Sequence, residues 1–184
     1  MFDLIDEKKL KNIDLAALSD SVKAQEFKDY FLDSPGREHY RLLAYFSGMY
    51  SKSKLLDIGT YLGHSALALS YNQTNEVLSF DIVKNNNLKH QHSNIKFIID
   101  NILNEKYINI INSAPFICLD INHDGVSEQN IYNFLKKINW KGLLFLDDIY
   151  LNSEMKDFWS TISKKKYDVT KYGHFTGSGL VLFE

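Results

Sequence analysis

Short apolar runs alternate with longer segments of helical spacing over residues 54–183, and this alternation constrains the fold more than any other feature. Runs typical of strands lie at Lys54–Ile58, Val77–Asp81, Ile95–Ile99, Pro115–Asp120, Gly142–Asp147 and Gly179–Phe183. Between them, apolar residues recur three or four positions apart, as at Ile131, Phe134, Leu135 and Ile138. Continuous runs such as "GLLFLD" are typical of strands buried on both faces. The pattern predicts an α/β fold with a largely parallel sheet.

Residues 1–50 differ because their pattern is helical throughout. One helix is expected over "DLAALSDSVKAQEFKDYFL", with an apolar face of Leu15, Leu18, Val22 and Phe27. After a break at Ser34, Pro35 and Gly36, a second helix, "REHYRLLAYFSGMY", leads into the first strand. These helices either cover a sheet edge or place "SPGREHYR" at the mouth of a site. We expect a single domain over 1–184, with a helical N-terminal extension (1–50) and a Rossmann-like core (51–184).

Composition excludes several classes of function. The 184 residues are 45% hydrophobic and 24% charged with a net charge of −2, which lacks the excess of Lys and Arg that nucleic-acid binding requires. Cys118 is the single cysteine, so it has no disulfide or zinc partner and is expected in the core. The start "MFDLIDEKKL" does not read as a signal peptide or membrane span, so a cytoplasmic protein is expected. The Asn-rich stretch 84–94 predicts a surface loop with a short helix.

The stretch "LLDIGTYLGHS", from Leu55 to Ser65, is the most informative local motif. An acid closes a strand, Gly59 and Gly63 follow, and a helix begins, as where backbone approaches a ligand closely. A dinucleotide fingerprint needs a glycine where Tyr61 stands, and a P-loop needs a lysine that is missing. Asp81, about 20 residues further on, suits hydrogen bonding to a ribose diol. The motif predicts a ligand with a ribose but little phosphate.

These motifs resemble those of class I S-adenosylmethionine-dependent methyltransferases, and within them a bacterial branch of small-molecule O-methyltransferases with a DxxH element after the fourth strand. "LLDIGTYLGHSALALS" is similar to the family's first motif and "VLSFDIV" to its ribose-binding acid. "PFICLDINHDG" and "GLLFLDDIY" are similar to its fourth and fifth strand ends. "GREHYRLLAYFS" and "YGHFTGSGLVLF" also resemble elements of that branch. The resemblance implies a Rossmann-like three-layer sandwich with a mainly parallel seven-stranded sheet that includes an antiparallel strand.

The resemblance also implies which residues hold the methionine part of the cofactor, S-adenosylmethionine. Asp57, Gly59 and Gly63 would surround it, with Asp57 receiving the ammonium group. Ser65 would hydrogen-bond near the carboxylate, or would only cap the helix. Tyr61 lies on the same loop and is expected at the cofactor and the acceptor pocket.

Three further residues would hold the adenosyl part. Asp81 would accept the ribose hydroxyls, and Asp100 and Asn101 would meet the adenine edge. The alternative for Asp100 is that it only ends a strand and caps the next helix.

Acidic residues follow two of the later strands. Asp120 ends the fourth run, and Asp147 and Asp148 end the fifth, so in a parallel sheet the three carboxylates should converge. Converging carboxylates need a cation or protons, and oxygen ligands suit Mg²⁺, Ca²⁺ or Mn²⁺. We expect Mg²⁺ there; the alternative is that these acids are only turn residues. Metal-dependent members of the resembled group carry acids, or acids and an amide, at these positions.

Histidines supply the candidate general base. His123, three residues after Asp120, is the first candidate because a neutral imidazole can take a proton near pH 7, and His39 and His174 compete for the role. The expected function is methyl transfer from S-adenosylmethionine to a hydroxyl of a small molecule, with His123 and Asp120 catalytic and a divalent cation assisting. A nicotinamide-dependent oxidoreductase and a noncatalytic nucleotide-binding module remain alternatives. The expected partner is a small-molecule acceptor, without nucleic acid or membrane; a homodimer is left open.

Overall fold

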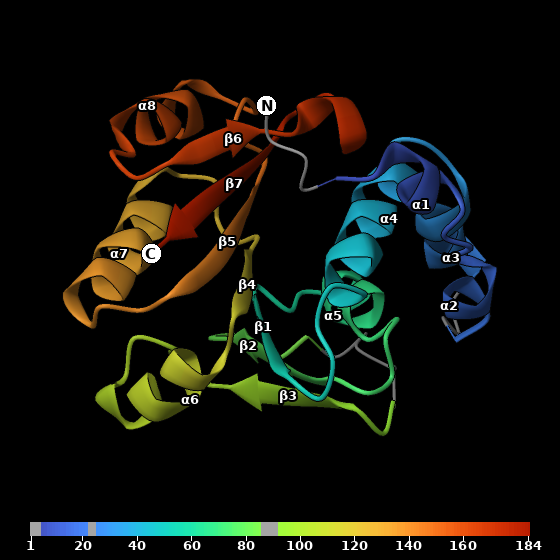
Figure 1. The fold of residues 1–184 in the computed structure, drawn as a ribbon, viewed down its shortest axis with the longest axis horizontal. Coiled ribbons are helices and arrows are strands. Elements are labelled where there is room, and N and C mark those ends of the chain that lie inside the picture. The colour runs from blue at the N-terminus through green and yellow to red at the C-terminus, as the bar shows by residue number, and fades with distance from the viewer. Residues whose placement is uncertain (1–4, 22–24, 86–91) are drawn as a thin grey trace.

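The computed structural model describes residues 5–21, 25–85 and 92–184, and these build a seven-stranded sheet in the order β3-β2-β1-β4-β5-β7-β6 (Figure 1). The strands are β1 (Lys54–Ile58), β2 (Glu76–Asp81), β3 (Ile95–Ile99), β4 (Phe116–Leu119), β5 (Gly142–Asp147), β6 (Lys166–Asp168) and β7 (Ser178–Phe183). Neighbouring strands from β3 to β5 pair in parallel, whereas β7 pairs antiparallel with β5 and β6. The mainly parallel sheet with an antiparallel strand is therefore confirmed.

Helices cover both faces of this sheet (Figure 1). Before β1 come α1 (Glu7–Lys11), α2 (Ala16–Ser21), α3 (Gln25–Leu32) and α4 (Gly36–Ser47); later come α5 (His64–Leu69), α6 (Ile108–Ser113), α7 (Val126–Lys137) and α8 (Ser153–Thr161). Short 3₁₀ turns lie at Glu105–Tyr107 and Thr170–Tyr172. In the described parts of the chain, every helix is too short or too polar to span a lipid bilayer.

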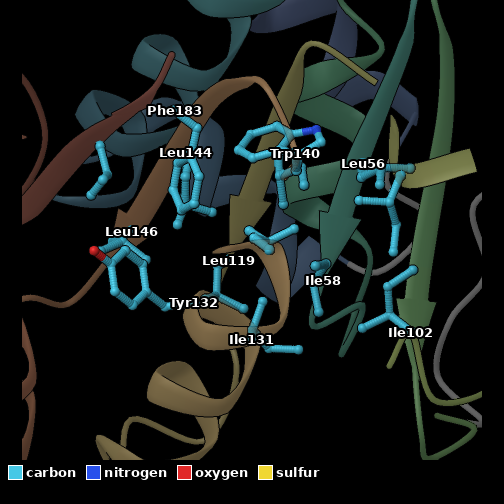
Figure 2. Close-up of a cluster of buried hydrophobic side chains, with 14 of the residues drawn as sticks. Leu56, Ile58, Ile102, Leu119, Ile131, Tyr132, Trp140, Leu144, Leu146 and Phe183 are labelled. Carbon is cyan, nitrogen blue, oxygen red and sulfur yellow. The ribbon is translucent and has the colours of Figure 1, made fainter. Parts of the chain in front are cut away.

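Two hydrophobic clusters lie on opposite faces of the sheet. Because side chains alternate along a strand, Leu55 joins the cluster with α4 and α5, while its neighbour Leu56 joins the cluster with α6, α7 and α8. Phe116 and Ile117 divide in the same way on β4. Figure 2 shows the second cluster, in which Trp140 packs against Phe183 with ring centroids 5.1 Å apart. Burial on both faces explains why the central strands are continuous apolar runs.

The helices before β1 are part of this packing. Leu42, Leu43 and Phe46 of α4 are fully buried in the first cluster, and Phe46 stacks on Phe116 with ring centroids 5.5 Å apart. Within the helix expected over residues 14–32, the described residues form α2 and α3. Val22 lies outside the described residues, as do positions 86–91 of the Asn-rich stretch.

Strand prediction succeeded for the strands that carry an apolar run, including the edge strand β3, and failed at the opposite edge. The bounds of β1, β3 and β5 are those predicted, and Cys118 on β4 is fully buried as expected. The edge strand β6 was missed because its three residues, "KYD", are partly exposed and form no apolar run. β6 instead owes its place to antiparallel pairing with β7.

The first cluster makes a testable prediction about stability. Phe116→Ala should lower the free energy of unfolding by about 3–5 kcal/mol, because the side chain is fully buried and its removal leaves a cavity. Phe175 is 80% exposed, so Phe175→Ala is a matched control that should change the value by no more than about 0.5 kcal/mol. Urea denaturation followed by circular dichroism measures both, and equal effects would contradict the assignment of Phe116 to the core.

Candidate functional site

A pocket of about 470 Å³ opens at the carboxyl ends of the parallel strands. β1 and β4 are neighbours in the sheet although β2 and β3 lie between them in the sequence, so the direction of strand addition reverses there. Ligands of open α/β sheets bind at this reversal. Residues that line the pocket include Gly59, Tyr61, Asp81, Asp100, Asn101, Asp120, Asn122, His123, Ser127 and Asn130.

The turn between β1 and α5 is built on two glycines. Gly59 has a φ of 107°, and a Cβ there would lie 1.6 Å from the carbonyl oxygen of Asp120. Gly63, with a φ of 81°, is the N-cap residue of α5. The sequence suggested that Gly59 is needed for the approach of a ligand, but the structure shows a nearer constraint in the chain's own backbone. A side chain at Gly59 would therefore disturb the fold before it met any ligand.

Asp57, at the end of β1, is fully buried below this turn. The hydroxyl of Ser79 donates to its Oδ2 at 2.6 Å, and Thr60 hydrogen-bonds to Ser79 at 2.6 Å. Burial raises the pKa of Asp57 to about 7, although hydrogen bonds from Ser79 and Ser65 oppose the rise. Ser65 thus lies close enough to affect the carboxyl of Asp57, whose Oδ1 has no hydrogen-bond partner among the described residues. The N-cap of α5 is Gly63, without a side-chain cap. The ligand contacts expected of Asp57 and Ser65 stay predictions.

Asp81 is held in place at the wall of the pocket. Its Oδ2 accepts the backbone N–H of Tyr61 at 3.0 Å, and its Oδ1 accepts that of Val83 at 2.9 Å. Each carboxylate oxygen retains a free lone pair, which is what recognition of two adjacent hydroxyls requires. The Tyr61 side chain is 70% exposed beside it.

Asp100 and Asn101 also line the pocket, and the loop after β3 holds both. Asp100 accepts the hydroxyl of Tyr107 at 2.8 Å and pairs with Lys106 at 2.5 Å. These two partners, together with the N–H of Asn101, lower the pKa of Asp100 to about 2. Asn101 accepts the N–H of Leu103 at 2.9 Å. Both residues therefore shape the loop as well as the pocket wall.

A second group of side chains lies next to the pocket. We call it the acid–histidine cluster; its members are Asp120, His123, Asp147, Asp148, His39 and His174. The acids follow β4 and β5, as expected from the parallel sheet. His39 comes from α4, and His174 comes from the segment before β7. Asp120 and His123 belong to both the pocket and the cluster.

Histidines separate the carboxylates of this cluster. The Oδ1 of Asp147 lies 3.2 Å from Nδ1 of His39 and 2.8 Å from Nε2 of His174. The Nε2 of His123 lies 3.2 Å from Oδ1 of Asp120 and 3.5 Å from Oδ2 of Asp148. The repulsion expected between bare carboxylates is relieved by these rings, which sequence spacing did not reveal.

The titration of the cluster follows from burial and pairing. Burial alone would raise the pKa of Asp147, but His39 and His174 outweigh it and hold that pKa well below its usual range. Burial, together with the charge of Asp147, raises the pKa of Asp120. Burial would lower the pKa of His123, but Asp120 and the neighbouring carboxylates outweigh it and raise that pKa to about 9. Without another positive charge nearby, His123 is therefore protonated at neutral pH.

Several buried polar atoms of the cluster lack a hydrogen-bond partner. They are Nδ1 of His39, Nε2 of His123 and Oδ1 of Asp148. Buried polar atoms are normally satisfied, so a concentration of exceptions needs an explanation. The atoms that surround them are carboxylate oxygens and imidazole nitrogens, and both are suitable ligands for a divalent cation.

Among the described residues, two groups have ligand atoms within 4.8 Å of one another: His39, Asp147 and His174; and Asp120, His123 and Asp147. Both contain Asp147 and at least one imidazole. The set expected from the sequence, Asp120, Asp147 and Asp148, stays a prediction, with Asp148 placed 3.7 Å from Nδ1 of His174.

Three of the five non-glycine residues with positive φ among the described residues lie on the same loops; the other two, Lys52 and Asn139, lie elsewhere. Tyr61, His123 and Asp148 have φ values of 41°, 56° and 56°, in the left-handed region that non-glycine residues rarely occupy. Such residues gather at functional sites, where the surrounding structure holds them. Tyr61 takes this conformation in the position where a dinucleotide fingerprint has glycine.

Solved structures provide the comparison, since no protein-family model and no curated protein matches the sequence. A protein from Staphylococcus aureus described as a candidate caffeoyl-CoA O-methyltransferase has a TM-score of 0.63 and 14% identity, with 98% of this chain and 97% of that chain covered. The methyltransferase PaMTH1 from Podospora anserina, bound to S-adenosylhomocysteine, has a TM-score of 0.56 and 12% identity, with 100% of this chain and 99% of that chain covered. Aeropyrum pernix fibrillarin, bound to S-adenosylmethionine, has a TM-score of 0.53 and 13% identity, with 78% of this chain and 75% of that chain covered. The fold is that of class I S-adenosylmethionine-dependent methyltransferases.

The buried Asp57 makes stability depend on pH. Its pKa is about 7 in the folded chain against an ordinary value of 3.8, so the folded state binds more protons between these limits. The free energy of unfolding should therefore fall as pH rises from about 4 to 7, by an amount on the order of a few kcal/mol. Asp57→Asn should remove this part of the decline.

Urea denaturation at pH 5 and pH 8 measures the effect on wild type and on Asp57→Asn. Asp157→Asn changes an exposed aspartate of α8 and serves as the control, with the same pH dependence as wild type. If wild type and Asp57→Asn decline in parallel, the carboxyl of Asp57 does not titrate in this range.

Proposed function

We propose that the chain is an S-adenosylmethionine-dependent methyltransferase that acts on a hydroxyl of a small molecule with the help of a divalent cation. One observation carries the proposal: Asp120 and His123 line the pocket and also belong to the acid–histidine cluster. A cofactor in the pocket would therefore present its methyl group beside ionisable groups that can bind and deprotonate an acceptor. The fold supports the cofactor class.

In this proposal different pocket residues hold different parts of the cofactor. Asp81, already oriented by the N–H groups of Tyr61 and Val83, would accept the two ribose hydroxyls. Asp100 and Asn101 would border the adenine. The Gly59 turn would then place the methionine part near the end of β1, toward Asp120.

Methyl transfer from a sulfonium needs alignment and deprotonation of the acceptor more than covalent help. A divalent cation on Asp120, Asp147 and Asp148 would supply Lewis acidity at the acceptor oxygen. His123 would accept the proton at Nε2, for which it must be neutral. Positive charge among the carboxylates favours the neutral ring, because it offsets the charge that raises the pKa of His123 to about 9.

A nicotinamide cofactor fits the turn less well. The glycine that lets a pyrophosphate approach the backbone is replaced by Tyr61, whose side chain lines the pocket. A cofactor with a ribose and no pyrophosphate avoids this obstacle.

The ribose assignment predicts a loss of affinity. Asp81→Ala should weaken binding of S-adenosylhomocysteine by about 1.5–3 kcal/mol, the range for hydrogen bonds to a charged group. Asp81→Asn should lose less, because its amide oxygen still accepts one N–H of the loop. Isothermal titration calorimetry measures both, with Asp157→Ala as an exposed control.

Unchanged affinity in folded Asp81→Ala would refute the assignment. Thermal shifts with NAD and NADP run in parallel, and a shift with either one but none with S-adenosylhomocysteine would favour the oxidoreductase alternative.

Cation dependence predicts a separation between turnover and cofactor binding. After exhaustive chelation with EDTA, methyl transfer to a hydroxyl acceptor should fall by at least about tenfold and return on addition of Mg²⁺ or Mn²⁺. Affinity for S-adenosylhomocysteine should change little, because the pocket residues that hold it lie outside the carboxylate set. A radiolabelled methyl-transfer screen over small hydroxyl compounds supplies the assay. Full turnover after chelation would show that methyl transfer does not require the cation, and would leave the proposal of a methyltransferase standing.

A further inference from the structure

Three side chains from three separate elements lie close together beside the pocket. His39 belongs to α4, Asp147 ends β5, and His174 precedes β7. Their ligand atoms lie within 4.8 Å of one another. His39 and Asp147 are only 4% and 7% exposed, so this group of side chains lies in the interior of the fold.

One buried polar atom of this group has no hydrogen-bond partner. The Nδ1 of His39 lies 3.2 Å from Oδ1 of Asp147 but has no hydrogen-bond partner. The same Oδ1 already faces Nε2 of His174 at 2.8 Å. A buried ring nitrogen without a partner is costly, and it points at the carboxylate oxygen that another ring nitrogen shares.

The spacing of these atoms matches that of metal ligands. Bonds of about 2.1 Å to nitrogen and oxygen place neighbouring ligand atoms about 3.0 Å apart at right angles and about 3.4 Å apart in a tetrahedron. The distances at Asp147, 3.2 Å and 2.8 Å, lie close to this range. The imidazole nitrogens lie within 4.8 Å of each other, so the two rings would have to move closer together to share one ion with Asp147.

We infer that His39, Asp147 and His174 bind a divalent transition metal ion, with Zn²⁺, Fe²⁺, Mn²⁺ and Co²⁺ as the class that two imidazoles and one carboxylate select. Mg²⁺ prefers oxygen ligands and is disfavoured here. The other ring nitrogen of His174 contacts the hydroxyl of Thr176, an arrangement that leaves Nε2 for the metal. Asp148 lies 3.7 Å from Nδ1 of that ring and is not one of the proposed ligands.

This site differs from the oxygen-ligated cation of the proposed methyl transfer, although both use Asp147. It does not depend on methyl transfer, because its ligands are defined by the fold alone. It would tie α4 and the segment before β7 to the end of β5, beside the reacting groups.

Metal titration of the stripped protein tests the inference. The full chain is treated with chelator, desalted, and titrated with ZnCl₂ and, separately, with MgCl₂ in a calorimeter. Wild type should bind one Zn²⁺ far more tightly than Mg²⁺. His39→Gln and Asp147→Asn should each weaken Zn²⁺ binding by more than about 100-fold, because loss of an outer partner alone costs about 10–100-fold.

Three control variants separate this set from its neighbours. His123→Gln and Asp148→Asn remove other members of the cluster and should leave Zn²⁺ affinity within a few-fold. His64→Gln removes a buried histidine of α5 outside the cluster and should do the same. Co²⁺ provides a second readout, since its visible absorption bands become more intense when the hydrated ion passes into a four- or five-coordinate protein site. This gain in intensity should be lost in His39→Gln.

His174→Gln is the fallback if His39→Gln does not fold, because His174 is nearer the surface and should show the same loss. Equal Zn²⁺ affinity in wild type and in the folded His39 or His174 variant would overturn the inference. So would loss of binding in Asp148→Asn or His123→Gln with retention in His39→Gln, which would assign the ion to the pocket side of the cluster.

Discussion

The close approach of the backbone just after β1 to the backbone just after β4 is the constraint on which the rest of the site depends. The N–H of Asp120 donates to the carbonyl of Ile58 at 2.9 Å, and only a glycine fits at position 59 beside the Asp120 carbonyl. This contact lies where the order of strands reverses. The loop after β4 carries Asp120 and His123, which belong to both the pocket and the acid–histidine cluster. Cofactor binding and acceptor chemistry would therefore meet at this loop.

Much of the fold could be predicted from the sequence because the central strands are buried on both faces. Leu55 and Leu56 enter opposite clusters, so β1 must be apolar at successive positions, and a run of this kind is visible in the sequence. The edge strand β6 has no such requirement. Pairing with β7 creates it, and that pairing depends on residues distant from Tyr167 in the chain.

The site was predictable to a similar extent. Asp120 and Asp147 follow parallel strands, and the topology brings such strand ends together. His39 and His174 reach Asp147 only because α4 packs on the sheet and the chain returns beside β5 in β7, and no spacing rule encodes that contact. Ser65 shows the same limit: its motif predicted a cap or a ligand contact, and its effect on the pKa of the buried Asp57 could not be predicted from the sequence.

A crystal structure of the protein with S-adenosylhomocysteine tests most directly whether the pocket and the cluster form one site. The expected result is a ligand whose ribose hydroxyls bind the carboxylate of Asp81 and whose sulfur faces Asp120, with Gly59 at its methionine part. A ligand bound elsewhere, or one in the pocket whose sulfur points away from Asp120, would contradict the proposed arrangement.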